Sequence, residues 1–166
     1  MHNIILIGMA GAGKSTIGRE IAAIMNRPWI DTDKLIADKI NQPLAAFIKE
    51  HGVDAFKKVE EEVLLKLNVS NSIISTGGSA IYSGDGMEHL ESTGVIVYLE
   101  VDFETIEKRI SRNPDRGIAT DGNETLFDIY TSRLPIYKFW ADITVPCSNN
   151  SINKTIEDIT FHLTFF

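Results

Sequence analysis

Short apolar runs alternate along this chain with longer segments in which apolar residues recur every three or four positions. The short runs contain many β-branched and aromatic residues, which are typical of buried strands. They predict strands at residues 4–7, 28–30, 73–75, 95–100 and 143–145. Because strands that alternate with helices form βαβ units, the pattern predicts an α/β fold with a five-stranded parallel sheet.

The longer segments predict amphipathic helices that pack on this sheet. The clearest apolar faces lie at residues 14–25, 55–67 and 125–138. Shorter helices are expected at residues 34–40, 102–110 and 151–162. Asp102 and Ser151 begin two of them, since their side chains can cap a helix N-terminus.

Residues 111–124 have neither pattern and are rich in Asn, Asp and Gly. A loop of this length inside a compact domain is usually a functional segment or a disordered one, and we expect a lid here. The chain has 166 residues, 43% of them apolar, which fits one ordinary globular domain. We therefore expect a single domain over residues 1–166 with its lid at about 111–124.

Charge and composition exclude several partners. The 16 basic residues are scattered among 23 acidic ones, for a net charge of −7, so we expect no nucleic-acid partner. No run approaches the roughly 20 apolar residues of a membrane span, and the glycine-rich motif from Gly8 leaves no room for a secretory leader. We expect a cytoplasmic protein with no membrane partner, and its single cysteine, Cys147, cannot form an internal disulfide.

A glycine-rich motif joins the first predicted strand to the helix at residues 14–25. Its sequence from Gly8 to Ser15, GMAGAGKS, matches G-x-x-x-x-G-K-S/T in full. In such a loop backbone N–H groups surround a pyrophosphate, Lys14 adds a charge, and the Ser15 hydroxyl can join a magnesium shell. The alternative, a flexible glycine turn, does not account for the strand before it and the helix after it. The motif predicts ATP and Mg²⁺ as cofactors, bound by Gly11, Ala12, Gly13, Lys14, Ser15 and Thr16.

Two carboxylates follow the second predicted strand, at Asp31 and Asp33. Residues two apart on an extended segment project to the same side, roughly 6.5–7 Å apart. One carboxylate can then serve the metal and the other can face an acceptor hydroxyl. The alternative is that both residues stabilise the first turn of the helix at 34–40.

With these residues in place, the chain resembles the shikimate kinases, small P-loop enzymes that phosphorylate a hydroxylated ring acid with ATP and magnesium. The resemblance covers about residues 3–163 and includes the P-loop, Asp31-Thr32-Asp33, residues 52–60, Gly77-Gly78, Tyr98-Leu99-Glu100, Arg116, and Arg133-Leu134-Pro135-Ile136-Tyr137 with Ala141-Asp142. It implies a three-layer α/β/α fold with strand order 2-3-1-4-5 and an acceptor-binding helical region at about residues 33–62. It also implies a small hydroxy acid as substrate, with shikimate first, and we expect a monomer.

The resemblance implies roles for four residues, three around the transferred phosphate and one at the adenine. Asp31 would support the magnesium ion, and Asp33 would orient the acceptor hydroxyl and take its proton. Arg116, in the lid, would reach the transferring phosphate. Arg109 would lie against the adenine.

The acceptor site implied by the resemblance departs from the family pattern. Arg133 would bind the substrate carboxylate, and backbone N–H groups of Gly77 and Gly78 would face the substrate. The family pattern F-R-x-x-E has Lys57 here in place of its arginine, and lysine lacks the planar fork that binds a carboxylate at two points. The substrate-binding residues so implied are Asp33, Lys57, Gly77, Gly78 and Arg133.

Two further departures are Ser79, where the family has a third glycine, and Gly117-Ile118-Ala119 after the lid arginine, where it has P-L-L. Lys57 has an alternative role, because it can pair with Glu60 or Glu61 at helical spacing. Two other functions stay open for the whole chain. One is a related kinase that acts on a different acceptor, such as a sugar acid or another hydroxy acid. The other is a nucleotide-binding module without turnover.

Overall fold

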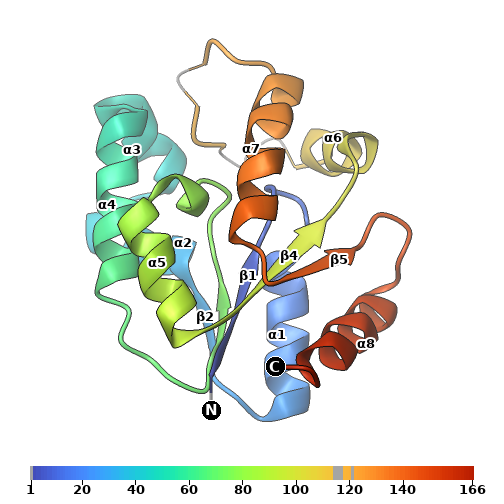
Figure 1. Ribbon diagram of the computed structural model, residues 1–166. Helices are drawn as coiled ribbons and strands as arrows, with labels where there is room; N and C mark the ends of the chain where they lie inside the picture. The colour runs from blue at the N-terminus through green and yellow to red at the C-terminus, as the bar shows by residue number, and fades with distance from the viewer. Residues whose placement is uncertain (1, 114–117, 121) are drawn as a thin grey trace.

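The computed structural model describes residues 2–113, 118–120 and 122–166, and Figure 1 shows strands and helices in alternation. The strands are β1 (Asn3–Ile7), β2 (Trp29–Asp31), β3 (Ile73–Ser75), β4 (Gly94–Glu100) and β5 (Ile143–Pro146). The helices are α1 (Lys14–Met25), α2 (Thr32–Ile40), α3 (Leu44–His51), α4 (Val53–Leu65), α5 (Gly84–Thr93), α6 (Phe103–Ser111), α7 (Leu126–Trp140) and α8 (Ile152–Leu163), with the short 3₁₀ helix η1 (Ala80–Tyr82).

The strands form one parallel sheet in the order β2-β3-β1-β4-β5, which confirms the predicted fold class. The central strand β1 is buried along its whole length. Its Ile4 lies opposite Ile73 of β3 on one side and Val95 of β4 on the other. A strand with neighbours on both sides and helices above and below has no polar face, which accounts for the continuous apolar run in the sequence.

Helices cover both faces of the sheet. Helix α1 packs on β1, β2 and β3 and against α8, whereas α5 and α7 contact β4 and α4 packs on α5. Figure 1 shows the pair α1 and α8 separated by the sheet from α4, α5 and α7. In such a sheet the carboxyl ends of the strands lie along one edge, where ligands bind between β1 and its neighbours.

The apolar pattern does not predict α3 and α5. Helix α3 has only eight residues and buries none of them fully, and an apolar run this short does not distinguish a helix from a strand. Helix α5 begins with Gly84 and contains Gly86, and glycine disfavours helix. A side chain at Gly86 would meet Leu64 of α4 at 2.9 Å, so this glycine permits the close packing of the two helices.

A second apolar cluster lies beside the main core. Ile36, Phe56 and Val63 are buried together, on α2 and α4, and Ala119 packs on their edge. This cluster supports the helices between residues 33 and 62, which the resemblance assigns to the acceptor. Within the described ranges, no helix combines the length and apolar character needed to cross a membrane.

Candidate active site

The loop after β1 has the backbone of a phosphate-binding loop. Gly11 and Gly13 have φ values of +84° and +96°, which glycine adopts without strain. At Gly8 a Cβ would lie 2.9 Å from the Leu99 carbonyl oxygen of β4, so the loop needs glycine there to leave the sheet. Gly13 begins α1, and no side chain in the described structure caps that helix. The N–H groups of its first turn therefore point out of the helix, as an anion site requires.

Lys14 lies over this loop with only 8% of its surface exposed. Its Nζ donates hydrogen bonds to the carbonyl oxygens of Gly8 and Met9, at 2.6 and 2.8 Å. These bonds hold a positive charge beside the loop amides, where the outer phosphates of a nucleotide would lie.

Ser15 and Asp31 meet at the start of α1. The Ser15 hydroxyl donates to Asp31 Oδ2 at 3.2 Å, and Oδ1 of the same carboxylate accepts from the Asp33 N–H at 3.0 Å. Adjacent ligands of an octahedral Mg²⁺ ion lie about 2.9 Å apart, so the Ser15 hydroxyl oxygen and Asp31 Oδ2 fit two neighbouring ligand positions. Asp31 thus caps α2, as the alternative predicted, and also contacts the P-loop serine.

Asp33 lies in the first turn of α2, so the expectation of an extended segment through both aspartates is wrong. The cap formed by Asp31 begins the helix one residue earlier, at Thr32. The Asp33 carboxylate nevertheless faces the turn after β3, because a Cβ on Gly77 would lie 2.5 Å from its Oδ1. The structure brings Asp33 to the carboxyl edge of the sheet.

The backbone N–H of Gly77 was expected to face the substrate, but it has a partner within the protein. Its N–H donates to Thr32 Oγ1 at 3.2 Å. Its missing side chain leaves the space into which two carboxylates point, since its Cβ would also meet Glu60 Oε1 at 2.8 Å. Gly77 therefore makes room for Asp33 and Glu60.

Glu60, on α4, is a buried carboxyl group that the residue pattern alone did not place in the site. It is 2% exposed, its Oε2 accepts a hydrogen bond of 2.7 Å from Ser79, and its Oε1 has no partner in the described structure. The pKa of Glu60 is raised to about 7, mainly by burial and also by the nearby Asp33 carboxylate, against the opposing effect of the Ser79 hydrogen bond. Ser79, the departure from the third glycine, thus has a polar partner in the site.

Arg133, on α7, is buried among the turn after β3 and the lid segment. It is 2% exposed, and its Nη2 donates to the Ala119 carbonyl at 3.1 Å. A Cβ on Gly78 would lie 2.9 Å from Nη1, so Gly78 permits this close approach. Nε has no hydrogen-bond partner among the described residues, and no described carboxylate forms an ion pair with the guanidinium. A buried guanidinium without an ion pair indicates an anionic ligand.

Lys57 does not form the alternative pair with Glu60 or Glu61 within the described structure. Its Nζ lies 4.4 Å from the ring centroid of Tyr82, on η1. The guanidinium carbon of Arg133 lies 5.6 Å from the same ring. The two predicted carboxylate-binding cations therefore lie beside one aromatic side chain.

Two cavities meet at the P-loop. One is lined by Lys14, Asp33, Ser79 and Arg133, and the other, lined by Arg109, extends toward α8. Both include Gly11 and Gly13. The first has a volume of about 90 Å³ and the second about 360 Å³, so the second is the one whose volume reaches the range typical of small-molecule sites.

The nucleotide cavity contains the remaining predicted residues. Arg109 Nη1 donates to the Gly11 carbonyl at 2.9 Å, which holds its side chain across the loop, and Thr16 lines the same cavity. Cys147, also in its wall, is buried, and burial raises the pKa of its thiol to about 11. This thiol is thus protonated at neutral pH, as expected for a packing residue.

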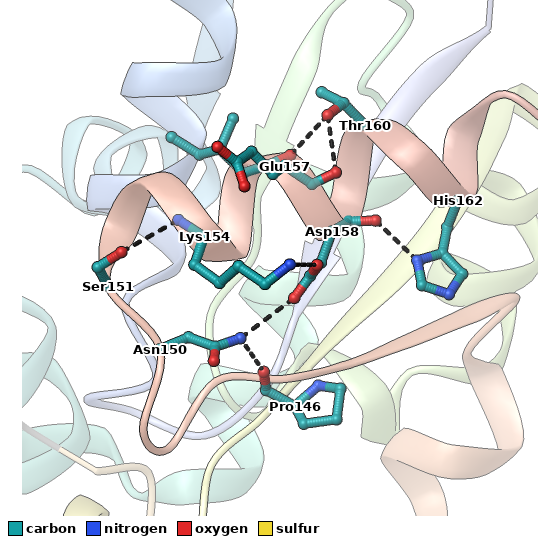
Figure 2. A network of polar contacts seen from close by, with 9 residues as sticks. Pro146, Asn150, Ser151, Lys154, Glu157, Asp158, Thr160 and His162 are labelled. Carbon is teal, nitrogen blue, oxygen red and sulfur yellow. Dashed lines mark hydrogen bonds and ion pairs between the residues drawn. The ribbon is translucent and has the colours of Figure 1, made fainter.

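Asn150 forms part of the same wall and is held by a polar network on α8, shown in Figure 2. Its Nδ2 donates to the Pro146 carbonyl at 2.8 Å and to Asp158 Oδ2 at 3.2 Å. Lys154 bonds the other oxygen of Asp158 at 2.6 Å, while Ser151 caps the helix. The network fixes the loop after β5 against α8 at the edge of the nucleotide cavity.

The described residues that line the acceptor side of the P-loop are Lys14, Ser15, Asp33, Gly77, Gly78 and Arg133, with Asp31 bonded to Ser15. Lys57 lines an adjoining cavity beside Tyr82 and Arg133, and Thr16 and Arg109 lie on the nucleotide side. Arg116 lies outside the described residues. Ile118 and Ala119, after it, line the acceptor cavity. Tyr82 had no signal in the sequence, because its neighbours in the chain do not distinguish it from an ordinary surface tyrosine.

A P-loop, a buried lysine over it and a second polar cavity beside it define a small-molecule kinase with the P-loop fold. A model of the shikimate kinase family matches residues 10–164. The chain belongs to the shikimate kinase family.

Relatives and solved structures agree with this assignment. A shikimate kinase from Caldanaerobacter subterraneus subsp. tengcongensis is 32% identical over 162 residues, covering 96% of this chain and 94% of its own length. One from Pasteurella multocida is 35% identical over 154 residues, covering 90% of this chain and 88% of its own. A structure of shikimate kinase from Acinetobacter baumannii in complex with shikimate superimposes with a TM-score of 0.90 at 28% identity, covering 99% of this chain and 94% of that one. One from Bacteroides thetaiotaomicron gives 0.85 at 26% identity, with 98% of each chain covered.

Proposed function

We propose that this protein transfers the γ-phosphoryl group of ATP to a hydroxyl group of shikimate. One observation carries the proposal: an acceptor cavity shares the P-loop with the nucleotide cavity, and two buried polar atoms beside it, Arg133 Nε in its wall and Glu60 Oε1 next to Gly77, have no partner among the described residues. Leaving such atoms unpaired is costly, so a polar ligand that satisfies them is favoured. Its chemistry matches the family, since a hydroxylated carboxylic acid offers hydroxyl groups to the carboxyl side and a carboxylate to the guanidinium.

The cations bind and orient the acceptor. Arg133 would bind its carboxylate through charged N–H groups, and Lys57 would add a second positive charge from α4. Gly78 allows the guanidinium to approach the turn after β3, which fixes the distance between the carboxylate and the P-loop. The opposite end of the acceptor then points to Asp33.

Asp33 would accept the proton of the attacking hydroxyl group. The acceptor oxygen forms a bond to the γ-phosphorus, the bond from that phosphorus to the bridging oxygen breaks, and ADP leaves. Lys14 and the loop amides would stabilise the charge on the transferring group, which is the main task of a protein in phosphoryl transfer. Arg116 keeps the role that the resemblance implies, at the same phosphate.

Ser15 and Asp31 would hold Mg²⁺ together with phosphate oxygens and water, the usual ligand set of nucleotide-bound magnesium. When bound, the ion neutralises charge on the phosphates. Within the described ranges no group of three or more His, Cys, Asp or Glu side chains is arranged to hold a metal, so the site needs the nucleotide to complete its ligands.

The proposal is tested by measuring ADP formation with ATP, Mg²⁺ and a panel of hydroxylated acids that includes shikimate, quinate and sugar acids. We expect shikimate to give the highest kcat/KM, with one phosphate added per ADP formed. A different preferred acid would replace shikimate as the substrate, and ATP hydrolysis without any acceptor product would contradict kinase activity.

A further inference from the structure

The ring of Tyr82 lies close to two positive side chains, those of Lys57 and Arg133. The ammonium of Lys57 is 4.4 Å and the guanidinium carbon of Arg133 is 5.6 Å from its centroid. Both distances are within the approximately 6 Å at which a cation is attracted by the negative face of an aromatic ring. We propose that Tyr82 is a positioning residue for acceptor binding, which holds these two cations at the mouth of the acceptor cavity.

The positive charges of Lys57 and Arg133 repel each other. Lys57 and Arg133 contact the same ring, and neither forms an ion pair with a described carboxylate. Two like charges near each other repel and favour conformations that separate them. Attraction of both cations to one ring offsets part of this repulsion before the carboxylate of an acceptor binds. The two side chains then need less ordering when the acceptor binds.

Lys57 is more flexible than the arginine that the family pattern has at this position. An arginine presents a rigid fork, whereas a lysine has a long stem and a compact charge that is free to turn into solvent. On α4, Lys57 is partly exposed, and the contact with Tyr82 holds its ammonium beside the ring that Arg133 also contacts. The ring thereby compensates for the loss of the fork at this position.

The place of Tyr82 agrees with this role. Lys57, Tyr82 and Arg133 line a cavity adjoining the acceptor cavity, with which it shares Arg133 and Ala119. The Tyr82 side chain is 40% exposed, so it makes little contribution to the core and its ring is open to the solvent from which an acceptor would enter. Tyr82 is the last residue of η1, where its N–H donates to the Ser79 carbonyl at 3.0 Å. This bond fixes the Tyr82 backbone next to Ser79, which lines the acceptor cavity.

The test compares Tyr82→Leu, which removes the ring, with Tyr82→Phe, which keeps it. The inference rests on the proposed function, so binding of shikimate to the full chain is measured by calorimetry without nucleotide, alongside steady-state kinetics. We expect Tyr82→Leu to raise the Kd and KM for shikimate about three- to tenfold, as the loss of two partly exposed cation–π contacts implies. The KM for ATP should stay within about twofold, and Tyr82→Phe should restore shikimate affinity to within about twofold.

A double mutant separates positioning from a general packing effect. In a Lys57→Met background, Tyr82→Leu should raise the KM by a smaller factor than in wild type, because one of the two cations is already gone. Phe139→Leu, on the exposed face of α7, is the matched control and should leave both KM values unchanged; Phe139 is 76% exposed. Equal effects of Tyr82→Leu on shikimate and ATP, no rescue by phenylalanine, or an unchanged shikimate Kd would each overturn the inference. A wild-type protein that does not bind shikimate would instead overturn the proposed function, and this inference with it.

Discussion

Replacing Glu60 by glutamine is expected to make the free energy of unfolding less dependent on pH. Burial raises the pKa of Glu60 in the folded protein to about 7, from an ordinary value of 4.5. Asp33 adds to this rise, while the Ser79 hydrogen bond and the charges of Arg133 and Lys57 oppose it. Between those two pH values the unfolded chain loses the proton that the folded protein keeps, so stability falls as pH rises.

The size of the effect follows from the two pKa values. A pKa difference from 4.5 to about 7 corresponds to about 3 kcal/mol of stability that is present below pH 4.5 and lost once the pH passes 7. Most of that loss, about 2–3 kcal/mol, falls between pH 5 and pH 8. Glutamine keeps the size of the side chain and an oxygen that accepts from Ser79, but it has no proton to lose.

Urea unfolding at intervals from pH 5 to pH 8, on wild type and Glu60→Gln, measures this difference. Other groups titrate in both proteins, so the informative quantity is the gap between the two curves, which should change by about 2–3 kcal/mol in favour of the variant as the pH rises. Glu61→Gln is a matched control on the same helix, where the carboxylate accepts a 2.6 Å hydrogen bond from Ser83 at a less buried position. Parallel curves for wild type and Glu60→Gln would refute the argument, and the same gap in the control would assign it to any carboxylate on α4.

Three further predictions concern catalysis. Lys14→Ala should lower kcat about 10²–10³-fold or more, because a preorganised charge at the transferring phosphate is lost; a folded variant with wild-type turnover, checked by its melting temperature, would contradict the kinase assignment. Asp31→Asn should raise the magnesium concentration needed for half-maximal rate, whereas Asp33→Asn should lower kcat with ATP affinity unchanged. Magnesium titrations that match in wild type and Asp31→Asn would remove this division of roles. Lys57→Arg should lower the KM for shikimate by a factor that corresponds to about 1 kcal/mol, since the fork binds a carboxylate at two points; an unchanged kcat/KM would place Lys57 outside the acceptor clamp.

Local patterns in the sequence were sufficient to predict the sheet and the phosphate loop. The five strands and the P-loop helix depend on runs of neighbouring residues, and the structure places all five within one or two residues of the predicted bounds. The strand order came from the resemblance, because periodicity does not determine which strands are adjacent. Helices α3 and α5 were missed, because their formation depends on packing against α4 and on Gly86, and a local pattern does not contain either.

The chemistry of the acceptor site was decided by tertiary structure. Sequence spacing offered Asp31 and Asp33 either as a carboxylate pair or as helix-stabilising residues, but only the fold shows that Asp31 both caps α2 and meets Ser15 from another element. Glu60 is an ordinary helical glutamate by its neighbours in the chain. Its raised pKa arises from burial opposite Asp33, which requires α2, α4 and the turn after β3 to converge. Burial and the approach of charges from separate elements are properties of the folded molecule, and they determine here which polar residues are available to a ligand.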